Sequence, residues 1–327
     1  MNRRLFCAAV GLGVGLASGA AFAQTNYPTQ PIRVLVPYVP GGATDYAARL
    51  VSEKAREILG QNLIVENKAG AGGLIALEDL MRSKPDGYTI MIGNVSTNAI
   101  TPIIFKNRMK YDYEKSVIPV ARLLVTPSVF MANANFPANN WQEFIEYAKK
   151  NPGKVRASST GIGSFVHFDL EVLKKRAGID VIHVPYREGA GGATTALVNG
   201  DVQVGSTNAV QGHMLRNSGK IKIFATNMTE RLKGLPDVPT YAEVGLPGHG
   251  TLNWSGVFAP AGTPPEIIAK LHKAFTEAAK SDFVLQRAEK SATYGFHTET
   301  QEEMAAFVKS ELEKWRKITS DVKIEMN

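Results

Sequence analysis

The stretch that decides the fold is residues 32–45, IRVLVPYVPGGATD. Apart from Arg33, its first five residues are apolar and rich in β-branched side chains, which is typical of a strand buried on both faces. Prolines and two glycines then turn the chain, and residues 46–59 carry apolar side chains at helical spacing until Gly60. We therefore predict a strand, a tight turn and a helix, which together open an α/β unit.

The same alternation continues along most of the chain. Glycine- or proline-rich turns at 70–73 and 85–87 separate a strand at 63–65, a helix at 74–82 and a strand at 88–92. Residues 94–98 are predicted to be a polar loop at the end of that strand. The rhythm restarts near residue 117 and gives strands at 121–124, 128–132, 155–158, 181–184, 202–206 and 221–226, with helices at 141–150, 164–177 and 193–198.

The last third of the sequence breaks this rhythm. A proline- and glycine-rich stretch precedes a strand near 254–259 and long helices that begin at residue 265 and near residue 302. Two βαβ modules followed by a last third that returns to the first module predict two α/β lobes, the first of them discontinuous. The predicted division is 24–124 with 252–327 for the first lobe and 125–251 for the second. A ligand is expected between the lobes, at the carboxyl ends of the strands.

Residues 1–23 have the pattern of a secretory signal peptide. Two arginines precede an apolar stretch, and Ala21-Phe22-Ala23 fits the small-x-small cleavage rule. We predict cleavage before Gln24 and export to the periplasm. An uncleaved membrane anchor is the alternative, and the Sec and twin-arginine routes both stay open. Because Cys7 is the one cysteine of the chain and lies in this segment, the mature protein is expected to be held by its cores rather than by disulfides.

The composition excludes several classes of protein. The 327 residues are 44% hydrophobic and 20% charged, with 30 glycines, 17 prolines and a formal charge of +7. These values are typical of a globular protein and not of a disordered or collagenous one. The lysines and arginines are scattered rather than clustered, which argues against nucleic acid as a partner.

Residues 41–45, Gly-Gly-Ala-Thr-Asp, are the strongest candidate for a binding site. Glycines let the backbone approach a ligand closely. The first N–H groups of a helix have no intrahelical acceptor, so a carboxylate can dock there. A second interpretation is that Asp45 caps the helix and the glycines only turn the chain. The sequence leaves both interpretations open.

A second polar turn at residues 158–164, SSTGIGS, repeats this arrangement, and Ser164 or Thr160 is predicted to cap the helix that follows. His167, one turn into that helix, either donates to a ligand or has a structural role. One anion-binding turn in each lobe would suit the two ends of a dicarboxylate. The prediction also includes polar residues at the ends of two other strands, Ser96 with Thr97 and Asn208, and the aromatic Tyr186, which suits either a cleft or the core. The predicted ligand-binding residues are Gly41, Gly42, Ala43, Thr44, Asp45, Ser96, Thr97, Ser159, Thr160, Gly163, Ser164, His167, Tyr186 and Asn208.

Sequence motifs of enzymes are missing from the chain. There is no G-x-S-x-G elbow, no H-E-x-x-H and no P-loop lysine, and the glycine turns do not complete the G-x-G-x-x-G of a dinucleotide site. The six histidines show no metal-ligand spacing. We therefore predict a binding protein with no catalytic residues, cofactor or metal. An enzyme acting on organic acids is the weaker alternative.

Motifs along the whole mature chain resemble those of a known family. They include Pro40-Gly41-Gly42, Asn67-Lys68-Ala69-Gly70, Pro85-Asp86-Gly87-Tyr88, His183-Val184-Pro185-Tyr186 and Ala259-Pro260-Ala261-Gly262. In order and spacing they resemble the Bug family, the periplasmic substrate-binding proteins of tripartite tricarboxylate transporters. The chain departs from that pattern at Arg187-Glu188-Gly189, where many members have Lys-Gly.

The resemblance implies a type II periplasmic-binding-protein fold, in which two α/β lobes close over one small ligand. It also implies that the ligand is a carboxylate, such as a di- or tricarboxylate, an amino acid or an aromatic acid. The partners would be the membrane permease subunits of a tripartite tricarboxylate transporter. A ligand sensor that hands its closed form to a membrane kinase is the alternative. Carried over from the family, the ligand contacts come from residues 41–45 and from Ser159, Thr160, Gly163 and Ser164.

Overall fold

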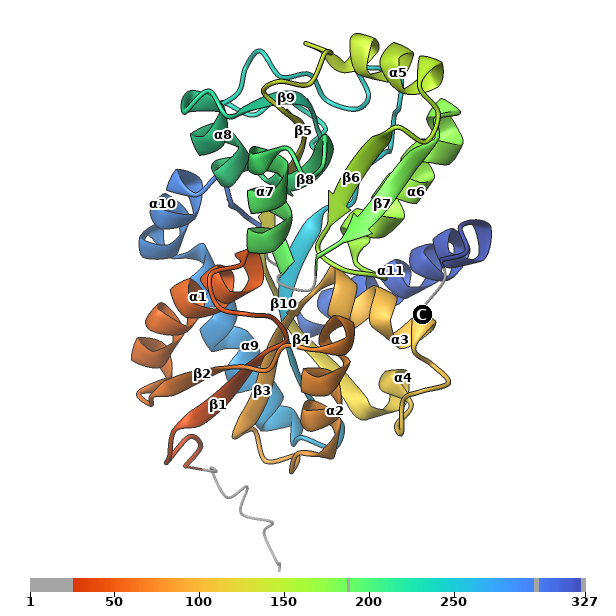
Figure 1. Cartoon of the computed structure of the whole chain (residues 1–327). Helices are drawn as coiled ribbons and strands as arrows, with labels where there is room; N and C mark the ends of the chain where they lie inside the picture. The colour runs from red at the N-terminus through yellow and green to blue at the C-terminus, as the bar shows by residue number, and fades with distance from the viewer. Residues whose placement is uncertain (1–25, 187–188, 297–299, 325–327) are drawn as a thin grey trace, which may run out of the picture.

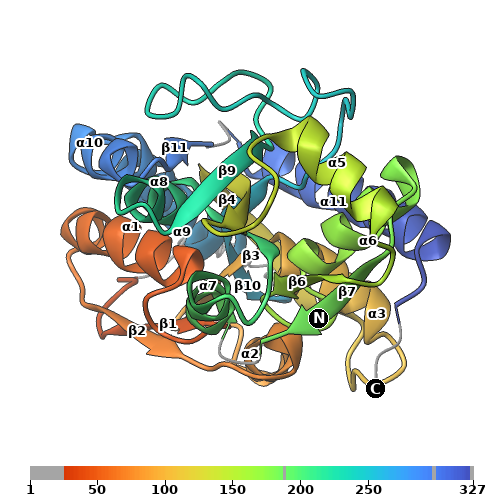
Figure 2. The same ribbon diagram turned by 45° about the horizontal axis from the view of Figure 1, so that its top comes forward.

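The computed structural model describes residues 26–186, 189–296 and 300–324, and in it the chain forms two lobes, each built on a β-sheet with helices packed around it (Figure 1). Figure 2 shows the same arrangement from the second-lobe side. The predicted signal peptide and Arg187-Glu188 lie outside the described residues. Within the described residues, no helix combines the length and the apolarity that a membrane span requires.

The first lobe is built on a six-stranded sheet with the order β11-β4-β10-β3-β1-β2. Strand β1, next to the edge strand β2, pairs in parallel with β2 and β3, and β10 joins β3 to β4 in antiparallel pairing. The strands are β1 (Ile32–Val36), β2 (Leu63–Asn67), β3 (Thr89–Asn94), β4 (Val117–Thr126), β10 (Asn253–Pro260) and β11 (Tyr294–Gly295). The helices are α1 (Ala43–Leu59), η1 (Ala71–Gly73), α2 (Leu74–Arg82), η2 (Ser96–Ile100), α3 (Thr101–Ile104), α4 (Tyr113–Ser116), α9 (Pro265–Lys280), α10 (Asp282–Lys290) and α11 (Gln301–Asp321).

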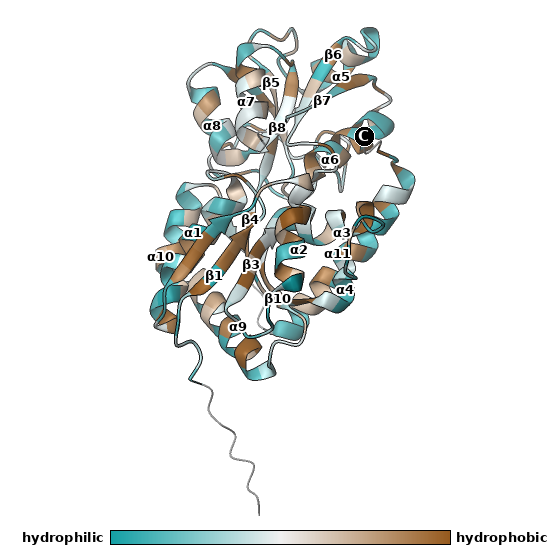
Figure 3. Cartoon of the chain, turned by 60° about the horizontal axis from the view of Figure 1, so that its bottom comes forward, coloured by the Kyte–Doolittle hydropathy of each residue, from teal (hydrophilic) through white to brown (hydrophobic). Residues whose placement is uncertain are grey.

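The side chains of β1 alternate between two hydrophobic cores. Val34 and Val36 pack into the core formed with α1 and α9, whereas Leu35 packs into the core that contains Leu77 of α2 and Trp315 of α11. Figure 3 shows the strands of this sheet in the brown of hydrophobic residues between teal-edged helices. Burial on both faces is the reason that β1 has no polar alternation in its sequence, and it confirms the predicted strand.

The second lobe is built on a five-stranded sheet with the order β7-β6-β8-β5-β9. Strand β6 pairs in parallel with β7 and β8, and β5 is antiparallel to β8 and β9. The strands are β5 (Ser128–Asn133), β6 (Val155–Ser159), β7 (Val181–Pro185), β8 (Val204–Asn208) and β9 (Ile221–Thr226). The helices are α5 (Trp141–Lys150), α6 (Phe165–Ala177), α7 (Gly189–Asn199) and α8 (Ala209–Asn217).

The chain passes between the two sheets at residues 126–128 and again before β10. One side chain joins these passages: Asn227 accepts a hydrogen bond from the backbone N–H of Ser128 at 2.8 Å and donates to the carbonyl oxygen of Thr251 at 2.7 Å. The first sheet holds β4 as far as Thr126. The division into 24–124 with 252–327 and 125–251 stays a prediction about which residues move together.

Most predicted elements are confirmed, with α2 and α5 at the predicted bounds. Several predictions were wrong in detail. Helix α1 begins at residue 43 rather than 46, because Asp45 turns back inside the helix to hold Gly41. Residues 96–98 are helical and buried, and their burial on all sides leaves no periodic pattern to detect. Helix α7 begins at Gly189 rather than 193, and the short helices α8 and α10 were missed.

Candidate ligand-binding site

The first-lobe segment (residues 41–45) joins the carboxyl end of β1 to the first turn of α1. Gly41 adopts φ +86°, a conformation that suits glycine, and Gly42 is the N-cap residue. Because Gly42 has no side chain, no hydroxyl or carboxylate of the cap residue occupies the first-turn N–H groups. These donors remain for an anion, and they lie beside the exposed Gly41.

Asp45 anchors the first-lobe segment from inside the helix and does not cap it. The carboxylate accepts hydrogen bonds from the Gly41 N–H at 2.9 Å, from Arg49 Nε at 3.0 Å and from Asn67 Nδ2 at 2.9 Å. Although burial opposes ionisation, these hydrogen bonds, above all that of Arg49, lower the pKa of Asp45. The carboxylate is only 3% exposed and its charge is matched by Arg49, so it presents little repulsion to an anionic ligand.

A second layer of polar side chains supports the first-lobe segment from behind. Thr44 accepts a hydrogen bond from Asn94 Nδ2 at 3.0 Å. The Tyr38 hydroxyl donates to Asn94 Oδ1 at 2.6 Å and lies 2.6 Å from Thr97 Oγ1. Burial raises the pKa of Tyr38 to about 12, against the effect of these hydrogen bonds. Thr44 and Thr97, both predicted as ligand residues, are buried in this network, Thr97 completely.

The second-lobe segment (residues 159–164) joins β6 to α6. Ser164 is the N-cap, as predicted: its Oγ accepts the N–H of His167 at 3.3 Å and donates to the Gly161 carbonyl at 2.8 Å. Gly161 and Gly163 adopt φ +119° and +76°, which permits the sharp turn. The Thr160 hydroxyl is half-buried and makes no hydrogen bond within the described part of the chain, so it stays available to a ligand.

Two imidazoles lie against the second-lobe segment. His183 Nε2 on β7 is 2.6 Å from Ser159 Oγ, and the N–H of Gly163 donates to His167 Nδ1 at 3.3 Å. The two rings stack with centroids 3.6 Å apart. Burial lowers the pKa of both histidines to about 4, and the Lys174 ammonium and the His167 ring add smaller effects. Both rings are therefore neutral near pH 7.

The two lobes touch beside these segments. Ser96 Oγ in the first lobe accepts the N–H of Phe165, the first residue of α6, at 3.1 Å. Phe168 packs edge-on against Trp315 of α11 with centroids 5.6 Å apart. Figure 1 shows α7 and the start of α6 directed toward the first lobe. Ser96 therefore links the start of α6 to the first lobe, while the two segments lie at the facing ends of their sheets.

Tyr186 and Asn208 have structural contacts of their own. The backbone N–H of Tyr186 donates to the Ser159 carbonyl at 3.1 Å, and its ring packs against the core that contains Leu197. Asn208 is the N-cap of α8 and accepts the N–H of Gln211 at 2.9 Å. Ligand contact by either residue, as by the others of the set, stays a prediction.

The predicted ligand-binding set left out four residues that shape the site: Arg49, Asn67, His183 and Asn94, the last of which lies in the predicted polar loop. For Arg49 a signal was present, because it lies one helical turn after Asp45. Asn67 and His183 come from strands that only the sheet order brings beside the segments. No local pattern in the sequence could have paired them with Asp45 or Ser159.

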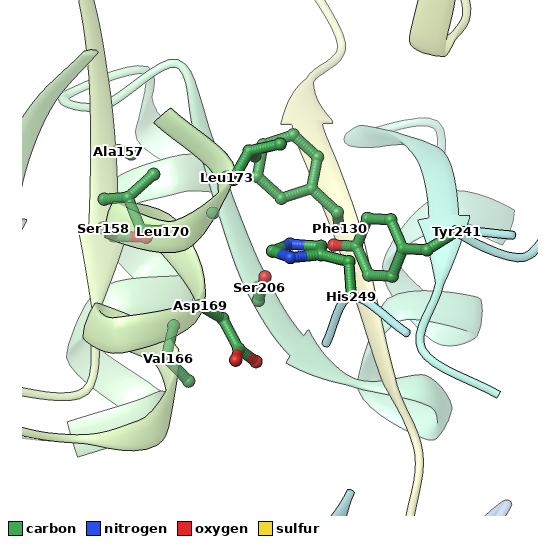
Figure 4. Close-up of a pocket in the computed structure, with 11 residues that line it drawn as sticks. Phe130, Ala157, Ser158, Val166, Asp169, Leu170, Leu173, Ser206, Tyr241 and His249 are labelled. Carbon is green, nitrogen blue, oxygen red and sulfur yellow. The ribbon is translucent and has the colours of Figure 1, made fainter. Parts of the chain in front are cut away.

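A small cavity lies under α6, behind the second-lobe segment (Figure 4). Its lining includes Phe130, Ser158, Asp169, Tyr241 and His249, and none of the predicted ligand-binding residues. The Asp169 carboxylate accepts hydrogen bonds from the Thr251 N–H and hydroxyl at 2.9 and 2.7 Å, and burial raises its pKa to about 6. Because this carboxylate would repel an anion, we do not assign the ligand to the cavity. No group of three or more His, Cys, Asp or Glu side chains among the described residues could hold a metal ion.

Comparison with known proteins supports the resemblance found in the sequence. The profile of the tripartite tricarboxylate transporter family receptor matches residues 47–324. The chain belongs to this family. The solved structure of the periplasmic binding protein BugD is 31% identical, has a TM-score of 0.83, and is similar over 91% of this chain and 99% of that one.

Two further solved structures of similar proteins contain ligands. MatC from Rhodopseudomonas palustris with bound malate is 31% identical with a TM-score of 0.81, over 89% of this chain and 99% of that one. Rpa4515 from R. palustris with adipate is 28% identical with a TM-score of 0.84, over 91% and 99%. These similarities confirm the predicted two-lobed type II periplasmic-binding-protein fold and the membership of the Bug family.

Proposed function

We propose that this receptor binds a small carboxylate, with a dicarboxylate as the first candidate, between its first-lobe and second-lobe segments. The observation that carries the proposal is a pair of helix starts, one in each lobe, that follow strands at the facing ends of the two sheets. Each contains glycines and an unoccupied donor. Malate and adipate, the ligands of the two R. palustris proteins, are both dicarboxylates, which supports this class. Two such segments match a ligand with an anionic group at each end.

The ligand would be held by dipoles rather than by a salt bridge. In the first lobe the N–H groups of residues 42–44 are the donors, and in the second the Thr160 hydroxyl is, because the Gly163 N–H already donates to His167. Arg49, which contacts Asp45 of the first-lobe segment, is already paired with that carboxylate. Converging N–H groups and hydroxyls, helped by ordered water, can hold a carboxylate without a dedicated cation.

Closure of the two lobes would then couple binding to delivery. Periplasmic binding proteins are a standard example of hinge closure around a ligand. A ligand that contacts both segments has higher affinity for the closed form and shifts the population toward it. We propose that the mature protein acts in the periplasm and presents this closed form to the permease subunits of a tripartite tricarboxylate transporter. The family match favours that partner over a membrane kinase, and we propose no catalytic role.

A thermal-shift screen of the protein from Gln24 onward tests the proposal. The protein is first unfolded and refolded to remove any co-purified ligand, then screened with mono-, di- and tricarboxylates, amino acids and aromatic acids. A ligand at one hundred times its Kd adds about 2.7 kcal/mol to the free energy of unfolding. The diamide of each dicarboxylate hit is the matched control and should give no shift.

Absence of a shift with every acid, or an equal shift with the diamides, would contradict carboxylate binding. Mass spectrometry of a bound hit after prolonged incubation separates a receptor from an enzyme. A receptor releases the acid unchanged in stoichiometric amount, whereas an enzyme converts it.

A further inference from the structure

The second-lobe segment contains two residues that give it little stiffness of its own. Gly161 and Gly163 both lie at positive φ, and glycine loses more conformational freedom on ordering than any other residue. A segment of this kind needs contacts from outside to hold its donors in one geometry. Holding the donors in place before the ligand arrives is what reduces the entropic cost of binding.

Two side chains supply these contacts, one near each end of the segment. His183 comes from β7, the parallel neighbour of β6, and its Nε2 lies 2.6 Å from Ser159 Oγ at the end of β6. His167 comes from the first turn of α6, and its Nδ1 accepts the N–H of Gly163 at 3.3 Å. The rings stack at 3.6 Å with an interplanar angle of 14°, so each ring fixes the other.

The arrangement requires neutral imidazoles. Because His167 Nδ1 accepts a hydrogen bond, its proton must be on Nε2, and a second proton would remove the acceptor. Two protonated rings at 3.6 Å would also repel each other. The charged groups that face the pair are Glu171 and Lys174 of α6: Glu171 Oε1 lies 3.9 Å from His167 Nε2 and 2.9 Å from Lys174 Nζ. The neighbouring strand β6 contributes the uncharged hydroxyl of Ser159.

We infer that His167 and His183 are positioning residues for the ligand, which act as a stacked neutral pair that fixes Ser159 and Gly163 in the second-lobe segment. His167 then serves the ligand through the Gly163 backbone rather than as a direct donor. This inference rests on the proposed function, because the segment it concerns is one of the two proposed to hold the carboxylate.

Paired substitutions separate positioning from simple packing. His167→Asn places an amide oxygen near the site of Nδ1 and keeps the acceptor, whereas His167→Leu removes it. His183→Gln keeps a polar atom near the site of Nε2, whereas His183→Leu removes it. His213→Leu on α8, whose ring contacts Asn217, is the matched control in the same lobe.

Isothermal titration of these variants with malate and adipate gives the binding result. Both leucine variants should weaken Kd about tenfold, the loss of one well-placed hydrogen bond, while the asparagine, glutamine and His213→Leu variants stay within about threefold of wild type. Equal Kd values for the leucine variants and wild type would overturn the inference. If wild type binds neither acid nor any other acid of the screen, the proposed function fails instead.

Nitrogen-15 NMR of the ligand-free protein tests the same geometry without a ligand. At pH 7 His167 should be the neutral Nε2–H tautomer, and the Gly163 amide should be protected from exchange in wild type and in His167→Asn but not in His167→Leu. A charged His167, a proton on its Nδ1, or unchanged Gly163 protection in His167→Leu would overturn the inference whatever the titrations give.

Discussion

The first-lobe and second-lobe segments occupy equivalent places, each between a parallel strand and a helix, but different chemistry holds them. The first is fixed by an ion pair: Asp45 holds the Gly41 N–H while Arg49 balances its charge. The second is fixed by neutral groups, the Ser164 cap and the stacked rings of His167 and His183. The first helix start has no side-chain cap, whereas the second has one.

The difference shows two ways to prepare a helix start for an anion. In the first lobe the cap position is left to glycine, so the ligand itself can occupy the first-turn donors. In the second lobe Ser164 already occupies the His167 N–H, and the segment offers the Thr160 hydroxyl instead. In both segments the charged groups are either balanced or absent. Because each segment has its own anchor, substituting one anchor should change the contacts of one lobe alone.

The largest effect is expected from Asp45→Ala. The change leaves the Gly41 N–H, Arg49 and Asn67 without their shared acceptor. The free energy of unfolding should fall by about 1–3 kcal/mol, and the Kd for the acid found in the screen should rise about tenfold or more. Urea denaturation and isothermal titration measure the two quantities. Glu57→Ala, which removes an exposed ion pair with Lys54 on the same helix, is the control and should leave Kd unchanged.

An unchanged Kd in Asp45→Ala would remove the first-lobe anchor from the binding site and would leave the second-lobe segment as the main determinant of affinity.

The pH dependence of stability should separate the two kinds of anchor. The pKa values of His167, His183 and His249 are lowered by burial from 6.5 to about 4, so their contribution to stability is fully present above pH 6.5 and is lost as the pH falls through about 4. Asp169, with its pKa raised from 3.8 to about 6, acts in the opposite sense: its contribution is present below 3.8 and lost as the pH rises through about 6. Because three histidines oppose one aspartate, Tm should fall between pH 6.5 and 4.

The double variant His167→Asn/His183→Gln sharpens this test, because it removes two of the three histidines and should lose Tm less steeply over the same pH range. A slope equal to that of wild type would mean that the stacked pair does not titrate as its burial requires.

A smaller effect is expected from Ser164→Ala. Loss of an N-cap side chain costs about 1 kcal/mol of stability, and here it also removes one of the hydrogen bonds to the Gly161 carbonyl, so Kd should rise severalfold. Asn140→Ala removes the N-cap of α5 and is the matched control, with a similar loss of stability and no change of Kd. Equal Kd values for the two variants would show that the cap serves the helix alone.

The smallest effect is expected at Gly42. Its φ of −79° suits any residue, and an added Cβ would meet only the Val39 carbonyl oxygen at 3.8 Å. Gly42→Ser should raise stability by a few tenths of a kcal/mol, because the hydroxyl caps α1, and should weaken binding, because it competes with the ligand for the first-turn donors. Gly42→Ala adds the Cβ without the hydroxyl and should bind more tightly than Gly42→Ser. The reverse order would show that the ligand does not use these donors.

The sequence was sufficient for the elements whose signals are local. The apolar run of β1, the helix α2 after its glycine turn and the Ser164 cap were predicted because each depends on residues close together in the chain. It was insufficient for residues 96–98, where complete burial replaces periodicity. The start of α1 was predicted too late because Asp45, whose side chain holds the Gly41 N–H, itself lies within the helix.

By itself the sequence determined the chemistry of the two segments: glycines that open the backbone, hydroxyls that donate, and no lysine or arginine within either one. Only the tertiary structure decided how each polar group is used. Sheet order brings Asn67 to Asp45 and His183 to Ser159. The fold also buries Thr97, whose hydroxyl lies against that of Tyr38. The physical reason is that a helix start depends on neighbours within one turn, whereas the partner of a side chain depends on which strand lies beside its own.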